Sequence, residues 1–149
     1  MDEQEKMVCF AQGMAHAMGP NDTAWKRGQS AAYFSLNPKW GAKFYRSVEE
    51  REYCFNLQFI ANQHDLAPPI GDLFTTKIQI VFGLDRTAFG FLTGHADVSK
   101  WKSGKAKSDL QTALLKIGID NKDIWTSGNT GYYDGKLVCI DFDCALEIK

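Results

Sequence analysis

Two oxygen-bearing side chains near the end of the sequence, Asn129 and Asp141, have the types and spacing to do chemistry. The segment between them contains an Asp-Gly pair between apolar stretches, which is typical of a tight β-hairpin. Such a hairpin would bring the two ends of the segment together. An amide oxygen and a carboxylate at adjacent loop ends are suitable ligands for magnesium. Asn129 and Asp141 are therefore candidate oxygen ligands.

A lysine in an apolar segment is the second candidate for chemistry. The segment GAKFYR has the pattern of a strand and places Lys43 between Ala42 and Phe44. A lysine whose strand neighbours are buried needs an anionic partner, because burying an unpaired ammonium group is costly. The alternative is that Lys43 lies at a sheet edge and is solvated.

Helical and strand patterns indicate the elements that would position these side chains. The first is a helix over residues 2–18, which opens with acidic residues. Its expected apolar stripe consists of Met7, Phe10, Ala11, Met14, Ala15 and Met18. Strand-like stretches follow between residues 24 and 46. Ser47 and Glu50 then form an S-x-x-E capping box, which opens a helix that runs to about His64.

The second half of the chain contains two further strands, a helix and the hairpin. The stretches TTKIQIVFGL and AFGFLT have strand patterns, and LDRT between them suggests a turn. Ser108 and Gln111 form a second capping box, which predicts a helix that closes at Gly118. The order of helices and strands indicates an α+β fold with an antiparallel sheet.

Composition favours one globular domain without a strong field for polyanions. The chain has 149 residues, of which 44% are hydrophobic and 23% charged, and its net charge is −1. Nucleic acid is therefore an unlikely partner for the molecule as a whole. The cysteines are scattered, which is typical of thiols in a reducing compartment. No apolar run approaches the roughly 18 residues that cross a bilayer. We expect a cytoplasmic protein.

Taken in order, these elements and motifs resemble the protein-kinase-like fold, including its aminoglycoside-phosphotransferase branch. In that resemblance, KRGQSAAYFSL is the turn between the first two strands, where Gly28 would approach the nucleotide phosphates. GAKFYR is similar to the third strand, and Lys43 would face the α- and β-phosphates. The implied partner of Lys43 is a glutamate of the next helix, for which we choose Glu52, with Glu49 as the alternative.

The strand FGFLTGHAD resembles the fifth strand and hinge of a kinase. The resemblance implies that backbone groups near Thr93, Gly94 and His95 would meet the edge of an adenine. ATP and Mg²⁺ are accordingly the cofactors that the resemblance implies.

The IDFD stretch resembles the metal-binding D-F-G of kinases, with two departures. Asp141 and Asn129 would hold the magnesium ion. The kinase pattern places the catalytic aspartate five residues before the asparagine, where this chain has Ile124. Asp123 lies six residues before it, so it can be the base only if the loop absorbs an extra residue. Asp143 occupies the position of the D-F-G glycine and adds a negative charge.

The resemblance also implies a domain organisation. We expect a single kinase-like domain over residues 1–149: an N-terminal helix (1–20), an N-lobe-like sheet with a helix like αC (24–96), and a reduced C-lobe remnant (97–149). Only six residues follow Asp143, so we expect the activation segment and the acceptor-binding helices to be missing.

Three functions are compatible with these features. The favoured one is a degenerate kinase-like module, a pseudokinase, that inhibits or regulates a protein partner by binding it. Such a chain would suit a compact viral genome as a counter-defence protein. The alternative is an active Mg-ATP-dependent phosphotransferase, completed by homodimerisation or acting on a small acceptor. The third is an unrelated α+β binding domain.

Aromatic side chains in predicted loops are candidates for partner binding, because tryptophan and tyrosine dominate interface energetics. They are Trp40, Trp101, Trp125, Tyr132 and Tyr133. The competing interpretation is that most tryptophans of a small domain are core residues. The polar segment HADVSKWKSGKAK contains four lysines, and we expect it to be a solvated linker rather than a phosphate or nucleic-acid patch.

Overall fold

The structure, a computed structural model, describes residues 1–17, 31–81, 84–126 and 128–148. The chain divides into two compact units, each of which is described on its own. Unit 1 comprises Met1–Glu52 and Gly71–Gly94, and unit 2 comprises Tyr53–Ile70 and His95–Lys149. Gly28, the predicted phosphate-loop glycine, lies outside the described residues.

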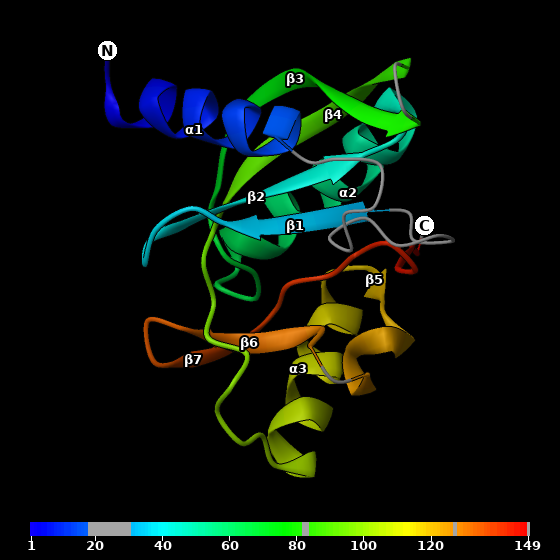
Figure 1. The fold of residues 1–149 in the computed structure, drawn as a ribbon. Helices are drawn as coiled ribbons and strands as arrows, with labels where there is room; N and C mark the ends of the chain where they lie inside the picture. Colours follow the sequence, from blue (N-terminus) through cyan, green and yellow to red (C-terminus); the bar gives the residue numbers. More distant parts are fainter. Residues whose placement is uncertain (18–30, 82–83, 127, 149) are drawn as a thin grey trace. The chain divides into compact units, whose positions relative to one another are not determined.

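The elements alternate between helices and strands, which confirms the predicted α+β class (Figure 1). In chain order they are α1 (Glu3–Ala17), β1 (Ala31–Ser35), β2 (Trp40–Tyr45), α2 (Val48–Gln63), β3 (Ile70–Val81), β4 (Leu84–Gly94), α3 (Gly104–Lys116), β5 (Ile119–Asp120), the 3-10 helix η1 (Lys122–Trp125), β6 (Thr130–Tyr133), β7 (Lys136–Cys139) and β8 (Leu146–Glu147). None of the helices in the described ranges is long and apolar enough to cross a membrane.

The described strands of unit 1 form a sheet in the order β1-β2-β4-β3. β2 pairs antiparallel with both β1 and β4, and Lys43 stands opposite Phe91. Because side chains alternate along a strand, Phe44 points to the face opposite that of Lys43. On its own face Phe44 packs edge to face against Phe34 and Phe74, with ring centroids 5.3 and 5.5 Å apart. The core of unit 1 forms on this face.

Helix α1 contributes to the same core, as the apolar stripe predicted. Ala11 and Ala15 are fully buried, but Phe10 of the expected stripe is 50% exposed. Small alanines allow the helix to approach the sheet closely, which leaves the bulky Phe10 at the margin of the contact. Polar side chains complete the attachment: Gln4 Oε1 accepts from the Asp72 amide at 2.8 Å.

The predicted start of α2 is confirmed. Ser47 Oγ accepts a hydrogen bond of 3.2 Å from the amide of Glu50, and the helix begins at Val48. This contact satisfies one of the amides that have no partner within the first turn of a helix.

Unit 2 has its own apolar core, built by the later part of α2, by α3 and by the short strands. Leu57, Leu114, Ile124 and Phe142 are almost completely buried in it. The predicted hairpin is β6–β7, in which Thr130 stands opposite Cys139. Its turn places Asp134 and Gly135 at φ values of 50° and 78°, which is the conformation for which an Asp-Gly pair is suited.

Two local expectations were wrong. Ser108 does not cap a helix but lies inside α3, which is capped by Ser103; the Ser103 Oγ accepts from the Ala106 amide at 3.0 Å. The residues LDRT do not form the turn, because β4 already begins at Leu84. For α3, Ser103 takes the capping role five residues before Ser108.

Candidate functional site

The loop that carries Asp123 is held by a buried asparagine. Asn121 is fully buried and precedes η1. Its Oδ1 accepts a hydrogen bond of 3.1 Å from the Asp123 amide. Its Nδ2 donates to the Asp141 carbonyl at 2.8 Å and contacts Cys139 Sγ at 3.1 Å. One side chain therefore links the backbone at Asp123 to the backbone at Asp141, although 18 residues separate the two in sequence.

Asn129 closes the same loop from its other end. Its Nδ2 donates to the Asp123 carbonyl at 2.9 Å, and its own carbonyl accepts from the Ile140 amide at 3.0 Å. The second contact extends the β6–β7 pairing by one step, so Asn129 and Asp141 lie at the two joined ends of the hairpin. The spacing of six residues between Asp123 and Asn129 is thus accommodated within one hydrogen-bonded loop.

Three carboxylates gather around Cys144. The thiol of Cys144 is hydrogen-bonded to the Asp123 carboxylate. This bond, partial burial and the charges of Asp123, Asp141 and Asp143 raise the pKa of Cys144 to about 11. An influence of all three carboxylates on one thiol requires them to be close together in space. The predicted base and the predicted metal ligand therefore both lie within electrostatic range of Cys144, as does Asp143.

Asp143 is engaged by the chain itself. Its amide donates to Asp141 Oδ1 at 2.9 Å, and Cys54 Sγ lies 3.4 Å from its Oδ1. Phe142 between the two aspartates is fully buried in the core of unit 2. The buried ring anchors the stretch, and the two carboxylates on either side of it are turned toward the polar cluster.

The metal expected at Asn129 and Asp141 can be tested against the donor atoms present. One carboxylate and one amide oxygen suit Mg²⁺, which commonly takes only one or two protein ligands and completes its shell with phosphates and water. No group of three or more His, Cys, Asp or Glu side chains in the described ranges could hold a metal ion. These two donors would therefore suffice only for a magnesium ion whose shell is completed by phosphates and water.

Three predicted nucleotide-binding residues belong to unit 1. Lys43 is 9% exposed, as the strand pattern predicted, and its Nζ lies 5.8 Å from the centroid of the Phe91 ring. The Glu52 carboxylate accepts from Arg51 at 2.9 Å, so the Lys43–Glu52 pair remains a prediction. Thr93 is buried in β4, opposite Gly41 of β2.

Arg51 was not singled out from the sequence, and the structure gives it a central position in unit 1. It is 9% exposed, donates to the Phe74 carbonyl at 3.2 Å and lies 5.7 Å from the centroid of the Phe89 ring. A buried guanidinium needs such partners, and here it ties the first turns of α2 to β3.

His95 and the aromatic candidates fall into three groups by exposure: half-buried, exposed and buried. His95, Tyr132 and Tyr133 are half-buried in unit 2, where the Tyr132 amide and carbonyl pair with Asp97. Trp101 and Trp125 are exposed, at 83% and 47%. Trp40 is a core residue with 7% exposure, as the competing interpretation held. Of the three tryptophans that the structure describes, Trp101 and Trp125 have the accessibility that partner binding requires, and Trp40 does not.

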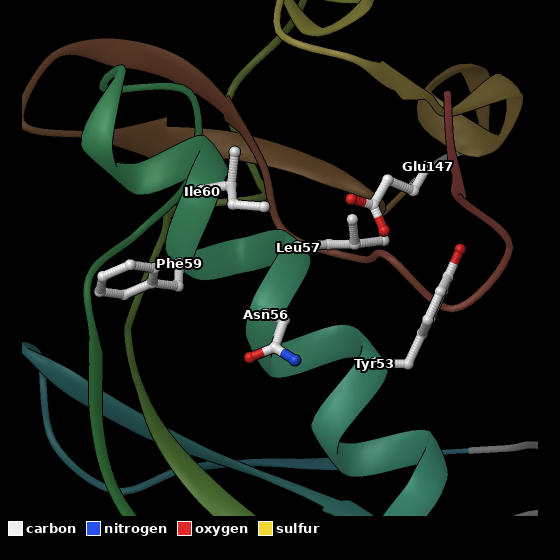
Figure 2. A pocket seen from close by; sticks show the side chains of 6 residues that line it. All are labelled: Tyr53, Asn56, Leu57, Phe59, Ile60 and Glu147. Carbon is white, nitrogen blue, oxygen red and sulfur yellow. The ribbon is translucent and has the colours of Figure 1, made fainter. Parts of the chain in front are cut away.

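A shallow groove of about 350 Å³ lies along α2 in unit 2. Its lining residues are Tyr53, Asn56, Leu57, Phe59, Ile60 and Glu147. Figure 2 shows Tyr53, Leu57 and Glu147 on one side of the helix and Phe59 on the other. No predicted nucleotide or metal residue lines this groove.

Comparison with solved structures identifies a relative in fold. The chain is similar to the L. pneumophila effector kinase LegK7, which was solved in complex with human MOB1A. The TM-score is 0.53 at 8% sequence identity, over 97% of this chain and 33% of the LegK7 chain. The fold is similar to that of a kinase. An antiparallel sheet with helices is compatible with a kinase N-lobe.

That similarity is structural only. This chain spans about a third of the length of the LegK7 chain. No protein-family profile matches the sequence. No curated protein matches it either.

Proposed function

We propose that this chain is a degenerate kinase-like module that regulates a protein partner by binding it and does not transfer phosphate. The observation that carries the proposal is the contact set of Asp143 and Cys144. Asp143 stands where the kinase pattern has glycine, its amide occupies Asp141 Oδ1, and the Cys144 thiol occupies the Asp123 carboxylate. Both groups on which transfer would depend are thus engaged by neighbouring residues.

The charge at the cluster supports the same proposal. A third carboxylate beside Asp123 and Asp141 makes the site more negative. A nucleotide phosphate is itself an anion, so each uncompensated carboxylate near it is repulsive. A glycine in place of Asp143 would lack this charge. Partner binding has no such requirement, and it is served instead by exposed aromatic anchors such as Trp101.

The alternative, a Mg-ATP-dependent phosphotransferase, is favoured by one specific contact. Asn129 Nδ2 donates to the Asp123 carbonyl, and Asp123 and Asp141 both act on Cys144, which supports a loop that absorbs the extra residue. In that function Asn129 and Asp141 would hold magnesium, which would neutralise the phosphates. Asp123 would accept the proton of the acceptor hydroxyl, and Lys43 would contact the phosphates.

The proposed function includes a protein partner, a location and an oligomeric state. LegK7 is itself known in a complex with a protein, which supports a protein partner here. We further propose a reduced C-lobe over residues 97–149, a cytoplasmic location and a viral counter-defence role. A homodimer would serve the alternative function, because a second copy could complete the acceptor site.

Nucleotide binding can be tested by thermal melting. The melting temperature is measured with ATP and Mg²⁺ in the wild type, in Lys43→Ala and in the control Lys39→Ala. Lys39 is an exposed lysine immediately before β2, the strand that carries Lys43, so its removal should leave any nucleotide effect unchanged. The melting temperatures without nucleotide report whether each variant folds.

The two functions predict different effects of ATP and Mg²⁺ on the melting temperature. Absence of a shift at saturating ATP would exclude the phosphotransferase and leave the binding module. A shift that is lost only in Lys43→Ala shows a working nucleotide site, because a ligand that binds the folded state raises its stability. The proposed function then depends on whether that nucleotide is turned over.

A further inference from the structure

Lysine and aromatic side chains gather on one surface of unit 2, around the start of α3. We call this surface the basic–aromatic patch, and it consists of Lys100, Trp101, Lys102, Lys107 and Trp125. Lys107 Nζ lies 5.9 Å from the centroid of the Trp125 ring. Lys100 Nζ lies 5.8 Å from the centroid of the Tyr132 ring. The segment expected to be a solvated linker is thus a structured surface.

The positive charges of this patch are only partly balanced. Lys105, the one lysine of this segment outside the patch, forms an ion pair with Asp109 at 2.8 Å. The first turn of α3 contains no Asp or Glu. Desolvation and the charge of Lys107 lower the pKa of Lys102, whereas Asp97 opposes this shift. Two ammonium groups are therefore held close enough to repel each other. An anionic ligand would relieve that repulsion.

Trp101 adds an apolar anchor to this charged surface. Its side chain is 83% exposed, the highest exposure among the large apolar side chains that the structure describes. A tryptophan is a strong interface residue when a partner covers it, because it buries a large area with few rotatable bonds. The patch therefore offers one highly exposed aromatic ring beside two lysines, Lys102 and Lys107, that repel each other.

A protein segment fits this arrangement better than a nucleic acid does. Single-stranded nucleic acids bind through several aromatic rings, on which successive bases stack. Here the rings of Trp125 and of the neighbouring Tyr132 already contact Lys107 and Lys100, and Trp101 is the most exposed ring of the patch.

We propose that the basic–aromatic patch docks an acidic segment of a protein partner. Carboxylates of that segment would pair with Lys102 and Lys107, and an apolar side chain would cover Trp101. The inference rests on the proposed function, a module that works by binding a protein, and specifies the surface and the chemistry of the partner.

The test uses a fluorescein-labelled oligo-glutamate peptide with one central leucine, titrated with the full chain and followed by fluorescence anisotropy. The charge-reversed variant is Lys102→Glu with Lys107→Glu. Its control is Lys6→Glu with Lys116→Glu, two exposed lysines outside the patch whose reversal changes the net charge equally. Trp101→Ala tests the anchor. This variant should fold normally, because its side chain is exposed.

We expect the wild type to bind the peptide, with affinity that falls as salt is added. The Lys102/Lys107 variant should bind at least about tenfold more weakly, while the Lys6/Lys116 variant should retain binding. Trp101→Ala should weaken binding of the leucine peptide but not of a peptide without leucine.

Three outcomes would overturn the inference: no peptide binding, equal losses in both double variants, or tighter binding of an oligothymidylate at the same salt concentration. None of them bears on phosphate transfer. Conversely, phosphate release by the chain would refute the proposed function and leave the peptide result unchanged, so the two failures are distinguishable.

Discussion

The thiol of Cys144 reports on the carboxylates around it. Its pKa is raised to about 11 by the hydrogen bond with Asp123, by partial burial and by the neighbouring charges. A raised pKa keeps the thiol protonated at neutral pH, and only the thiolate is a good nucleophile. Cys144 should therefore react slowly with alkylating reagents even though it is exposed.

Replacing Asp123 by Asn tests this arrangement at the level of one residue. The substitution removes the negative charge and replaces one of the two acceptor oxygens by a donor, so the pKa of Cys144 should fall toward its ordinary value. The measurement is the rate of iodoacetamide alkylation against pH, resolved by mass spectrometry for each cysteine. Cys9 of unit 1 is also exposed and should react equally in both proteins. Identical Cys144 profiles would show that Asp123 does not act on this thiol.

Asn121 was not singled out from the sequence, yet its side chain hydrogen-bonds to the backbone at both Asp123 and Asp141. Replacing it by Ala would leave the Asp141 carbonyl and the Asp123 amide without their side-chain partner. We expect a loss of about 2–3 kcal/mol in the free energy of unfolding, because unsatisfied buried polar groups are costly. Urea denaturation measures this loss. Asn56→Ala on the exposed face of α2 is the control and should change stability by less than about 0.5 kcal/mol.

At the scale of elements, the start of α3 can be tested directly. Ser103 caps the helix through its Oγ, whereas Ser108 is an exposed residue within it. Ser103→Ala should cost about 1 kcal/mol of unfolding free energy. Ser108→Ala should be neutral or slightly stabilising, since alanine has the higher helix propensity. Both free energies come from the same denaturation experiment. A larger loss in Ser108→Ala than in Ser103→Ala would show that Ser108 is the capping residue.

Local signals were predictable from sequence, and signals that depend on distant partners were not. The Ser47 cap and the Asp134–Gly135 turn involve residues a few positions apart, so their patterns suffice. Asn121 acts on Asp141, 20 residues away, and no spacing rule finds such a contact. The Asn-x-Asp order at 121–123 is nevertheless typical of an asparagine that bonds the amide two residues on, and it could have indicated the turn at Asp123.

In the candidate site, too, only the contacts between nearby residues could be predicted from the sequence. The hairpin predicted that Asn129 and Asp141 lie at joined strand ends, which the pairing of Asn129 with Ile140 bears out. The contribution of Cys144 to the site could not be predicted, because it depends on how the chain turns back after the buried Phe142. The exposure of Trp101 and the burial of Trp40 were likewise open from sequence, since both follow a polar turn.

At the scale of the whole molecule, each unit has its own core, and the candidate residues are divided between them. Lys43, Glu52 and Thr93 belong to unit 1, whereas Asp123, Asn129 and Asp141 belong to unit 2. The fold is similar to that of LegK7 over nearly the whole chain. A similar fold does not imply a similar activity, so the activity must be judged from the site.

The central proposal is that this chain does not transfer phosphate. It is tested most directly by incubating the chain with γ-labelled ATP and Mg²⁺ and measuring labelled phosphate released or transferred to the protein. The controls are Asp141→Asn, which removes the charge of the predicted metal ligand, and Asp123→Asn, which removes the predicted base. We predict that the wild type gives the same signal as both variants. A wild-type signal above that of both variants would contradict the claim and establish the phosphotransferase.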